Sequence, residues 1–396
     1  MRNLFFICNA LDDMTRIERG IETDSPAASR KIFLLSKAVR KAGVQPLILS
    51  LGRGRQNGTG RYFQAKVCRV DGVPVIYLPF FHFPILSELL SLFSAVPMLW
   101  RMRRKKGKKT ALFYNRTLAY LAALVSAKIL RFNTVLDLED GEINLSLRSL
   151  SGLWSRVFCG LFDSLCSGGA LLACHALQRM TKLRPTQCCY GSLETLSTTA
   201  NWDLSSITIL FGGTVSYDTG AALLINVISM LRDESPSWAK DIRFEITGKG
   251  DCLEQFKALV DDSRKPNVVV HGRTTKGEYQ QILTRTQVGL ALKPNSGELA
   301  HTTFPSKVIE FASHGILVIT TDISDVQKVL GDGAIYLAVD DPRLLIEKLR
   351  WILENRDAAR DLSLNGARAV SAVCAPEIVG KTLSKFLFES SSGVPN

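Results

Sequence analysis

Short apolar runs rich in β-branched residues alternate with amphipathic segments along most of the chain. In the first half the runs predict strands, and the segments between them, with apolar positions three and four residues apart, predict helices. The strands are predicted over 3–9, 44–51, 67–78 in two pieces, 111–115, 134–138, 170–174 and 186–190, and the helices over 26–42, 84–104, 117–130 and 152–166. Asp71-Gly72 within 67–78 predicts a hairpin turn. This alternation is typical of a parallel α/β sheet.

The second half repeats the alternation and predicts a doubly wound domain of its own. Strands are predicted over 206–212, 243–247, 267–271, 287–292, 316–321 and 334–338, and helices over 220–232, 251–262, 276–285, 305–313 and 342–355, with further helical stretches after Asp357 and Glu377. A chain of 396 residues exceeds one ordinary core. We therefore expect domains at 1–200 and 201–375, separated near a polar run at 195–205. Residues 376–396 are expected to form a helix that returns to the first domain, followed by a frayed tail at 390–396.

Glycines follow several predicted strands of the second domain. The carboxyl ends of parallel strands meet at one edge of a sheet, where ligands bind, and glycine lets the backbone approach a nucleotide closely. The residues expected at this edge are Gly212, Gly213, Thr214, Gly248, Gly272, Arg273 and the loop 294–306. None of these loops is a complete dinucleotide fingerprint or a phosphate-binding P-loop. Their common placement predicts a nucleotide site.

The segment 302–315 predicts a loop that leads into a short helix ended by Gly315. Its first residues are Thr302, Thr303, Phe304, Pro305, Ser306 and Lys307. Pro305 suits the first helical turn, and Lys307 places a cation where the helix dipole disfavours it, which suggests a bound anion. Glu310, on the same face, can accept hydrogen bonds from a sugar diol. The alternative is a surface helix with an ordinary charged face.

The net charge of +12 is uneven, with 28 Lys and Arg against 13 Asp and Glu in residues 1–200 and 21 against 24 in the remainder. The first half therefore prefers an anionic partner. The apolar segment 78–100, too rich in proline for a membrane span, precedes a basic run that contains Arg101, Arg103, Arg104, Lys105 and Lys106. This pairing predicts an in-plane anchor on an anionic membrane surface, at the inner face of the cell membrane. The alternative is a buried helix with a solvated basic end. No nucleic-acid-binding signature accompanies the run.

The nine cysteines show neither Cys-x-x-Cys pairs nor ligand spacing with histidine. Several of them lie in apolar runs, which predicts small buried residues in a reducing cytosol. The chain contains no Asp-x-Asp motif. We therefore expect neither a metal nor a cofactor. Asp137, Glu139 and Asp140 end a predicted strand of the first domain and are candidates for orienting an acceptor hydroxyl. The alternative for these acids is a solvated loop.

The order of the glycine loops and of Phe304-Pro305-Ser306-Lys307 with Glu310 and Gly315 resembles the retaining glycosyltransferases of family four. The resemblance covers 206–375. It implies the type B glycosyltransferase fold (GT-B), in which two Rossmann-like domains face each other across a crevice. The Phe-Pro-Ser-Lys variant is similar to the branch that builds bacterial capsule, exopolysaccharide and lipopolysaccharide.

The resemblance implies roles for several residues of the second domain. It implies that Glu310 binds the nucleotide ribose and that position 302, usually a second glutamate, lies beside the donor sugar; here it is Thr302. The basic pair of the family is replaced by Thr214 and Thr219. Lys307, with Arg273, is then expected to hold the diphosphate and to stabilise it electrostatically as it leaves.

The predicted function is transfer of a sugar from a nucleotide-diphosphate donor to a saccharide acceptor, which we expect to be lipid-linked. Two alternatives remain at this point. A catalytically silent, membrane-associated partner of another transferase agrees with Thr214, Thr219 and Thr302. A nicotinamide-dependent sugar-modifying enzyme would need a glycine fingerprint after the first strand, where the sequence reads Cys8-Asn9-Ala10-Leu11.

Overall fold

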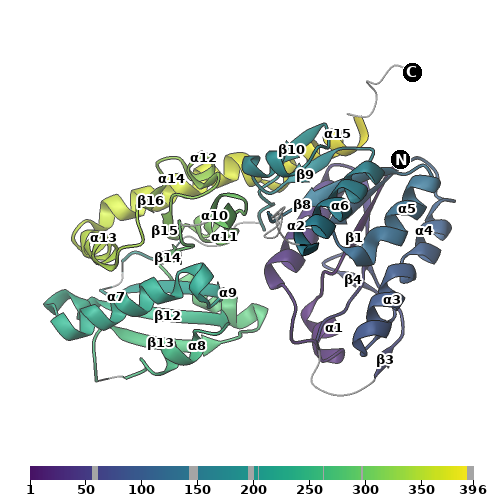
Figure 1. Cartoon of the computed structure of the whole chain (residues 1–396). Helices are drawn as coiled ribbons and strands as arrows, with labels where there is room; N and C mark the ends of the chain where they lie inside the picture. Colours follow the sequence, from purple (N-terminus) through teal and green to yellow (C-terminus); the bar gives the residue numbers. More distant parts are fainter. Residues whose placement is uncertain are drawn as a thin grey trace. The chain divides into compact units, whose positions relative to one another are not determined.

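The computed structural model describes residues 1–55, 61–141, 150–194, 200–203, 205–261, 263–295 and 298–389. The chain divides into two compact units, Met1–Ser192 with Ala375–Asn396 and Leu193–Cys374 (Figure 1). The polar run at 195–199 and the tail at 390–396, which carry the predicted boundary and the predicted fraying, lie outside the described residues. None of the described helices combines the length and the apolar character needed to traverse a bilayer.

The first unit is built on an eight-stranded sheet in the order β10-β9-β8-β7-β1-β2-β5-β4. Its strands are β1 (Arg2–Cys8), β2 (Val44–Ser50), β4 (Lys66–Val70), β5 (Val73–Tyr77), β7 (Lys108–Tyr114), β8 (Asn133–Leu138), β9 (Ala170–Leu172) and β10 (Thr186–Cys188), with β3 (Tyr62–Phe63) and β6 (Phe80–Phe81) in a separate pair. All neighbours pair in parallel except β4 with β5. These two form the predicted hairpin, in which Asp71 and Gly72 have the positive φ angles of its turn.

Two layers of helices cover this sheet. The helices are α1 (Asp13–Glu18), α2 (Pro26–Lys41), α3 (Pro84–Ser94), α4 (Val96–Met102), η1 (Leu118–Tyr120), α5 (Leu121–Ile129), α6 (Leu150–Leu165), η2 (His175–Met180) and α15 (Pro376–Glu389). Successive strand residues face opposite sides. Leu112 of β7 belongs to the core that includes residues of α2 and α15, whereas its neighbour Phe113 packs against Phe162 of α6. Because both faces are covered, the central strands are continuously apolar.

The second unit has a six-stranded parallel sheet in the order β13-β12-β11-β14-β15-β16. Its strands are β11 (Ile207–Thr214), β12 (Ile242–Lys249), β13 (Asn267–Gly272), β14 (Val288–Ala291), β15 (Leu317–Thr321) and β16 (Ala334–Leu337). Its helices are η3 (Tyr217–Thr219), α7 (Ala221–Glu234), η4 (Ser237–Asp241), α8 (Leu253–Lys257), α9 (Lys276–Arg285), α10 (Glu298–His301), α11 (Lys307–Ser313), α12 (Val326–Leu330), α13 (Pro342–Glu354) and α14 (Arg356–Cys374). The order reverses at β11 and β14, as in doubly wound sheets.

Three predicted helices differ from those observed. The helix predicted over 84–104 is interrupted at Ala95, because Pro97 lies in the first turn of α4, where its ring and missing N–H prevent a continuous helix. The helix predicted over 251–262 is reduced to α8. The helix predicted over 305–313 begins at Lys307 with Ser306 as N-cap, so Pro305 precedes the helix.

Candidate functional site

The strand ends of the second unit bring two glycines into direct contact. Gly213 of β11 and Gly248 of β12 pair across the sheet with φ angles of 115° and 124°. A Cβ atom at position 248 would lie 1.7 Å from the Gly213 carbonyl oxygen, so the approach requires glycine. Both predicted loops therefore meet at the carboxyl edge of the sheet.

Three side chains from two helices form a polar cluster in this unit. Lys307 Nζ of α11 donates to Glu310 Oε2 at 2.6 Å and to the Tyr279 hydroxyl of α9 at 2.8 Å. The Tyr279 hydroxyl in turn donates to Glu310 Oε2 at 3.0 Å. Lys307 Nζ also lies 4.6 Å from the centre of the Tyr279 ring, within range of a cation–π interaction. The Glu310 side chain is 9% exposed, so this cluster is largely withdrawn from water.

The polar cluster adjoins the glycine loop of β11. A Cβ atom at Gly213 would lie 3.2 Å from Lys307 Cε, and one at Gly212 would lie 3.6 Å from the Tyr279 hydroxyl. The structure thus gathers Gly212, Gly213, Lys307 and Glu310, four of the predicted donor-site residues, in one place.

The other predicted residues of the donor site occupy the strand ends and the loop before α11. Thr214 ends β11, Gly272 ends β13 with a φ of 64°, and Arg273 follows it. Thr302, Thr303, Phe304, Pro305 and Ser306 lead into α11, and of these the Thr303 side chain is buried in contact with Lys293. Sequence reasoning missed Tyr279 and Lys293. Lys293 lies two residues after the end of β14, at the sheet edge where ligands were expected, so its position could have indicated it.

A buried carboxylate attaches the far end of α9 to the sheet. Glu245 of β12, whose side chain is 0% exposed, accepts two hydrogen bonds from Arg285, at 2.9 and 2.7 Å, and one from Arg243 at 3.0 Å. His271 Nε2 of β13 lies 3.0 Å from the same carboxylate. Burial opposes its ionisation, but the Arg285 hydrogen bonds and charge outweigh burial and hold the pKa of Glu245 below its usual value. Because Arg285 ends α9, this network fixes the helix that presents Tyr279.

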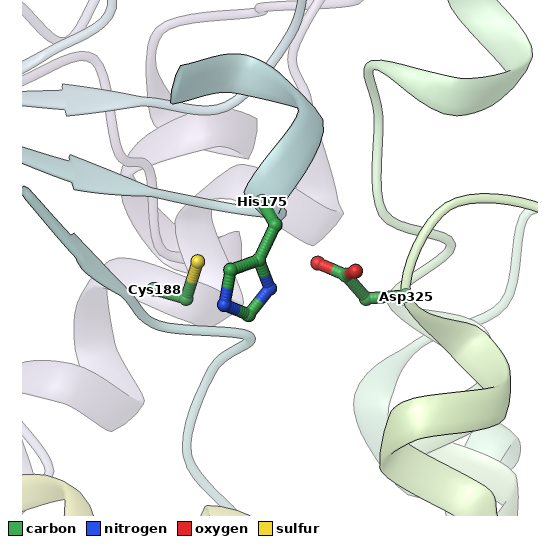
Figure 2. Close-up of side chains that lie close together, drawn as sticks. All are labelled: His175, Cys188 and Asp325. Carbon is green, nitrogen blue, oxygen red and sulfur yellow. The ribbon is translucent and has the colours of Figure 1, made fainter. Parts of the chain in front are cut away.

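In the first unit, the side chains of His175, which begins η2, and Cys188, which ends β10, lie close together (Figure 2). His175 Nδ1 lies 3.2 Å from the Tyr190 hydroxyl. The pair offers two of the three or four ligands that a zinc site takes. Figure 2 also draws Asp325, which belongs to the second unit and accepts from Lys328 at 2.8 Å. We assign no metal site to these side chains.

An acid cluster lies at the end of β8 in the first unit. Asp137 and Glu139 have side chains that are 1% and 13% exposed, and Lys31 of α2 reaches both. Lys31 Nζ contacts Glu139 Oε1 directly and lies 3.6 Å from Asp137 Oδ1. The third predicted acid, Asp140, is exposed. The alternative of a solvated acidic loop is therefore wrong for Asp137 and Glu139.

Burial sets the protonation of the acid cluster. It raises the pKa of Glu139 to about 8, because burial, together with the charge of Asp137, outweighs the attraction of Lys31. Burial lowers the pKa of Lys31, but the two carboxyl groups reverse this effect and raise it above its usual value, so the ammonium stays charged. Burial and the same carboxyl groups also raise the pKa of the Tyr114 hydroxyl. Near neutral pH the cluster holds a proton on a carboxyl group, beside a permanent cation.

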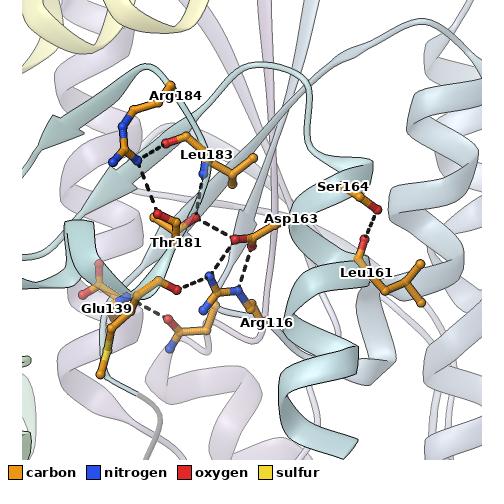
Figure 3. A network of polar contacts seen from close by, with 10 residues as sticks. Arg116, Glu139, Leu161, Asp163, Ser164, Thr181, Leu183 and Arg184 are labelled. Atoms are coloured by element: carbon orange, nitrogen blue, oxygen red, sulfur yellow. Dashed lines mark hydrogen bonds and ion pairs between the residues drawn. The ribbon is translucent and has the colours of Figure 1, made fainter. Parts of the chain in front are cut away.

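The acid cluster is supported by a polar network that reaches α6 (Figure 3). Asn115 adopts the left-handed conformation at a φ of 57°, and its Oδ1 accepts from the Glu139 backbone N–H at 2.8 Å. The side chain of the next residue, Arg116, is 2% exposed and donates two hydrogen bonds to Asp163 of α6, at 2.9 and 3.0 Å. Thr181 donates to the same carboxylate at 2.8 Å. This network holds the turn after β7 that positions Glu139.

The predicted membrane-binding residues lie at the exit of α4. Arg101 belongs to the last turn of α4, and Arg103, Arg104, Lys105 and Lys106 follow it towards β7; all five are exposed. Arg103 stacks its guanidinium on the Trp100 ring, at 5.2 Å from the ring centre. The alternative of a solvated basic end agrees with this exposure as well.

Comparison with known proteins identifies the class. Residues 206–355 match the model of a family described as Glycosyl transferases group 1, and this range contains all six strands of the second unit and α7 to α13. No curated protein matches the sequence. The second unit therefore resembles the domain that this family model describes, and the predicted class of enzyme, a glycosyltransferase, is confirmed.

Solved structures with a similar fold align over nearly the whole chain. HepE from Anabaena, solved with UDP-glucose, is 13% identical with a TM-score of 0.65, and the alignment covers 98% of this chain and 99% of HepE. Sucrose-phosphate synthase from Thermosynechococcus elongatus is 15% identical with a TM-score of 0.67 and coverage of 97% and 98%. A TarM variant from S. aureus, solved with UDP, is 11% identical with a TM-score of 0.63 and coverage of 98% and 100%. The predicted α/β fold of the GT-B class is confirmed.

Proposed function

We propose that the protein is a retaining glycosyltransferase that moves a sugar from a nucleotide-diphosphate donor to a lipid-linked saccharide during synthesis of cell-surface polysaccharide. The observation that carries the proposal is the cluster of Lys307, Glu310 and Tyr279 beside the glycine loop, within the domain that matches the family model. HepE and TarM, which share the fold, were solved with UDP-glucose and UDP, which supports a uridine nucleotide as donor.

In the proposed donor site, Lys307 binds the diphosphate and Glu310 binds the ribose. Lys307 is now held by Glu310 and Tyr279, and phosphate oxygens compete for its ammonium group when the donor binds. Glu310 then accepts from the ribose hydroxyls. The close backbone approach at Gly213 and Gly248 leaves no side chain between the phosphates and the sheet edge. In this proposal Thr302 contacts the sugar and Arg273 contacts the phosphates.

Transfer needs stabilisation of the leaving nucleoside diphosphate. The bond from the anomeric carbon to the diphosphate oxygen breaks, and a bond from that carbon to the acceptor oxygen forms on the same face. The acceptor proton passes to an oxygen of the diphosphate, so no strong side-chain base is needed. The ammonium group of Lys307 stabilises the negative charge that develops on the leaving diphosphate. This stabilisation is large in a site withdrawn from water.

The proposed role of the acid cluster is to orient the acceptor. Asp137 and Glu139, fixed by Lys31 and Asn115, present carboxyl oxygens to the acceptor hydroxyl, and Asp140 borders them. The raised pKa of Glu139 lets it donate as well as accept a hydrogen bond near neutral pH. This division assigns the acceptor to residues 1–200 and the donor to residues 201–375.

The exposed basic run at the end of α4 supports peripheral binding at the inner face of the cell membrane. Its five cations contact anionic lipid headgroups, so the enzyme acts where a lipid-linked acceptor is presented. Replacing Arg103, Arg104, Lys105 and Lys106 with serine should release the protein from anionic vesicles and leave nucleotide binding unchanged, because the proposed donor site belongs to the second unit.

Calorimetric titration with UDP, GDP and NAD tests the proposal against its two alternatives. Binding of UDP or GDP that is lost in Lys307→Ala supports the transferase. The matched control is Lys276→Ala in the same unit, where Lys276 is 62% exposed and pairs with Glu194 at 3.1 Å. Binding of NAD alone would indicate the nicotinamide enzyme, and binding of none of the three would indicate the silent partner.

A further inference from the structure

Exposed apolar side chains concentrate on one part of the first unit. Of the 21 large hydrophobic residues exposed in the described part of the chain, eleven lie between Phe83 and Leu161. The densest group is on α6, where Leu153, Trp154, Val157 and Leu161 are 51%, 73%, 56% and 47% exposed. Their spacing of one, three and four residues forms one stripe along the helix.

The opposite side of α6 is also apolar. Phe162 is fully buried and packs edge-on against Phe113 of β7, with 6.2 Å between ring centres, and Phe158 packs against Phe162. A helix that is hydrophobic on both sides is typical of one that is covered on both sides. The sheet covers one side of α6, and the exposed stripe is the other.

The stripe on α6 continues onto neighbouring helices. α5 packs against α6, α4 and α3, and these helices include the exposed Ile129, Trp100 and Phe93, at 65%, 43% and 60%. They belong to the layer on the Phe113 side of the sheet, whereas α2 and α15 pack together in the other layer (Figure 1).

Charge indicates what covers this face. Residues 84–131 contain ten Lys and Arg and one acidic residue, Glu88. The exposed basic run follows α4 directly, and the exposed Arg156 borders the stripe of α6. Aromatic and aliphatic side chains bordered by cations complement a bilayer with anionic headgroups over an apolar interior.

We propose that the outer face of α3, α4, α5 and α6 is a docking surface for an anionic lipid bilayer, with Trp154 and Val157 of α6 inserted below the headgroups. The inference rests on the proposed membrane binding and extends it from the basic run to α6. Through Asp163, α6 also holds Arg116 and the turn that positions Glu139. Docking of α6 therefore brings the support of the proposed acceptor site to the lipid surface.

Sedimentation of the full-length protein with vesicles tests the inference. The vesicles contain neutral phosphatidylcholine, with or without anionic phosphatidylglycerol. Trp154→Ser with Val157→Ser should weaken binding to anionic vesicles by about ten- to a hundred-fold, because two large apolar side chains no longer leave water. The control is Val260→Ser with Val339→Ser in the second unit, where the valines are 48% and 56% exposed, and it should bind as wild type does.

A second measurement uses the wild-type protein and a conservative variant that keeps an aromatic ring at position 154. Phospholipids brominated on the acyl chain should quench the tryptophan fluorescence of the wild-type protein, and Trp154→Phe should lose most of that quenching. Wild-type binding by the α6 variant together with no quenching would overturn the inference. If replacement of the four basic residues then still releases the protein, the proposed membrane binding stands without α6.

Other results identify other occupants of the face. Equal binding of the wild-type protein to neutral and anionic vesicles would overturn the role of charge. A chain that ignores both kinds of vesicle and forms a dimer that Trp154→Ser dissociates would assign the face to a second copy. Either result overturns the inference, and neither affects the nucleotide titration that tests the transferase.

Discussion

Replacing Lys31 with methionine probes the acid cluster most sharply. The Lys31 side chain is 11% exposed and forms ion pairs with the side chains of Asp137 and Glu139, which are 1% and 13% exposed. Removing one partner of a buried ion pair costs about 3–5 kcal/mol, because the remaining charge stays buried without compensation. Chemical denaturation at pH 8 should therefore show a loss of this size in the free energy of unfolding.

A second lysine of the same helix provides the control. Lys37 pairs with Asp71 at 2.5 Å, but their side chains are 28% and 46% exposed. Pairs so accessible to water contribute about 0.2–1 kcal/mol, so Lys37→Met should cost no more than this. Both substitutions exchange lysine for methionine within α2, so differences in helix propensity cancel.

The cost of Lys31→Met should also depend on pH. Without the cation, the pKa of Glu139 rises further, so the folded variant keeps a proton that the wild-type protein releases above about pH 8. The loss in stability should therefore grow between pH 6 and pH 9. Equal costs for the two lysine variants, or a Lys31→Met cost that is constant over this range, would refute the reasoning.

Three further predictions concern single positions. Lys307→Ala and Glu310→Ala should each weaken nucleotide binding by roughly ten- to a hundred-fold, since each removes a charge-assisted contact of about 1.5–3 kcal/mol; wild-type affinity in both by calorimetry would exclude this site. Thr302→Glu should change the ranking of nucleotide sugars in a hydrolysis panel more than the affinity for the nucleotide, and an unchanged ranking would show that Thr302 does not contact the sugar. Glu139→Gln should flatten the fall in stability from about pH 5 to pH 8. Over this range the folded protein holds a proton on Glu139, whose pKa is raised from 4.5 to about 8, and the unfolded chain does not. If the free energy of unfolding, measured by denaturation, depends on pH equally in Glu139→Gln and wild type, this prediction is wrong.

Most strands could be predicted because their apolar runs are buried on both faces. β1 is observed at Arg2–Cys8 against a prediction of 3–9, and the hairpin at Asp71-Gly72 follows from the turn residues. The two-residue strands β3 and β6 and the five-residue helix α12 are too short to show a periodic spacing of hydrophobic residues, and none of them was predicted.

The sequence predicted those residues of the candidate site whose positions depend on local sequence pattern. The glycine loops and Lys307 with Glu310 come from strand ends and one short helix, which the sequence displays directly. Tyr279 lies 31 residues before Glu310, and Lys31 lies 108 residues before Glu139. Contacts at such separations depend on how helices pack on the sheet, and the sequence near Tyr279 and Lys31 carries no ligand-binding pattern.

In the proposed reaction, the second unit binds and activates a nucleotide-diphosphate sugar through Lys307 and Glu310. The most direct test incubates the purified protein with a panel of nucleotide sugars and follows release of the nucleoside diphosphate. We predict that at least one donor is hydrolysed, that Glu310→Ala loses this activity, and that Glu254→Ala, at a side chain 78% exposed, keeps it. Hydrolysis that is unaffected in Glu310→Ala, or a panel in which no nucleotide sugar is bound or cleaved, would contradict the account.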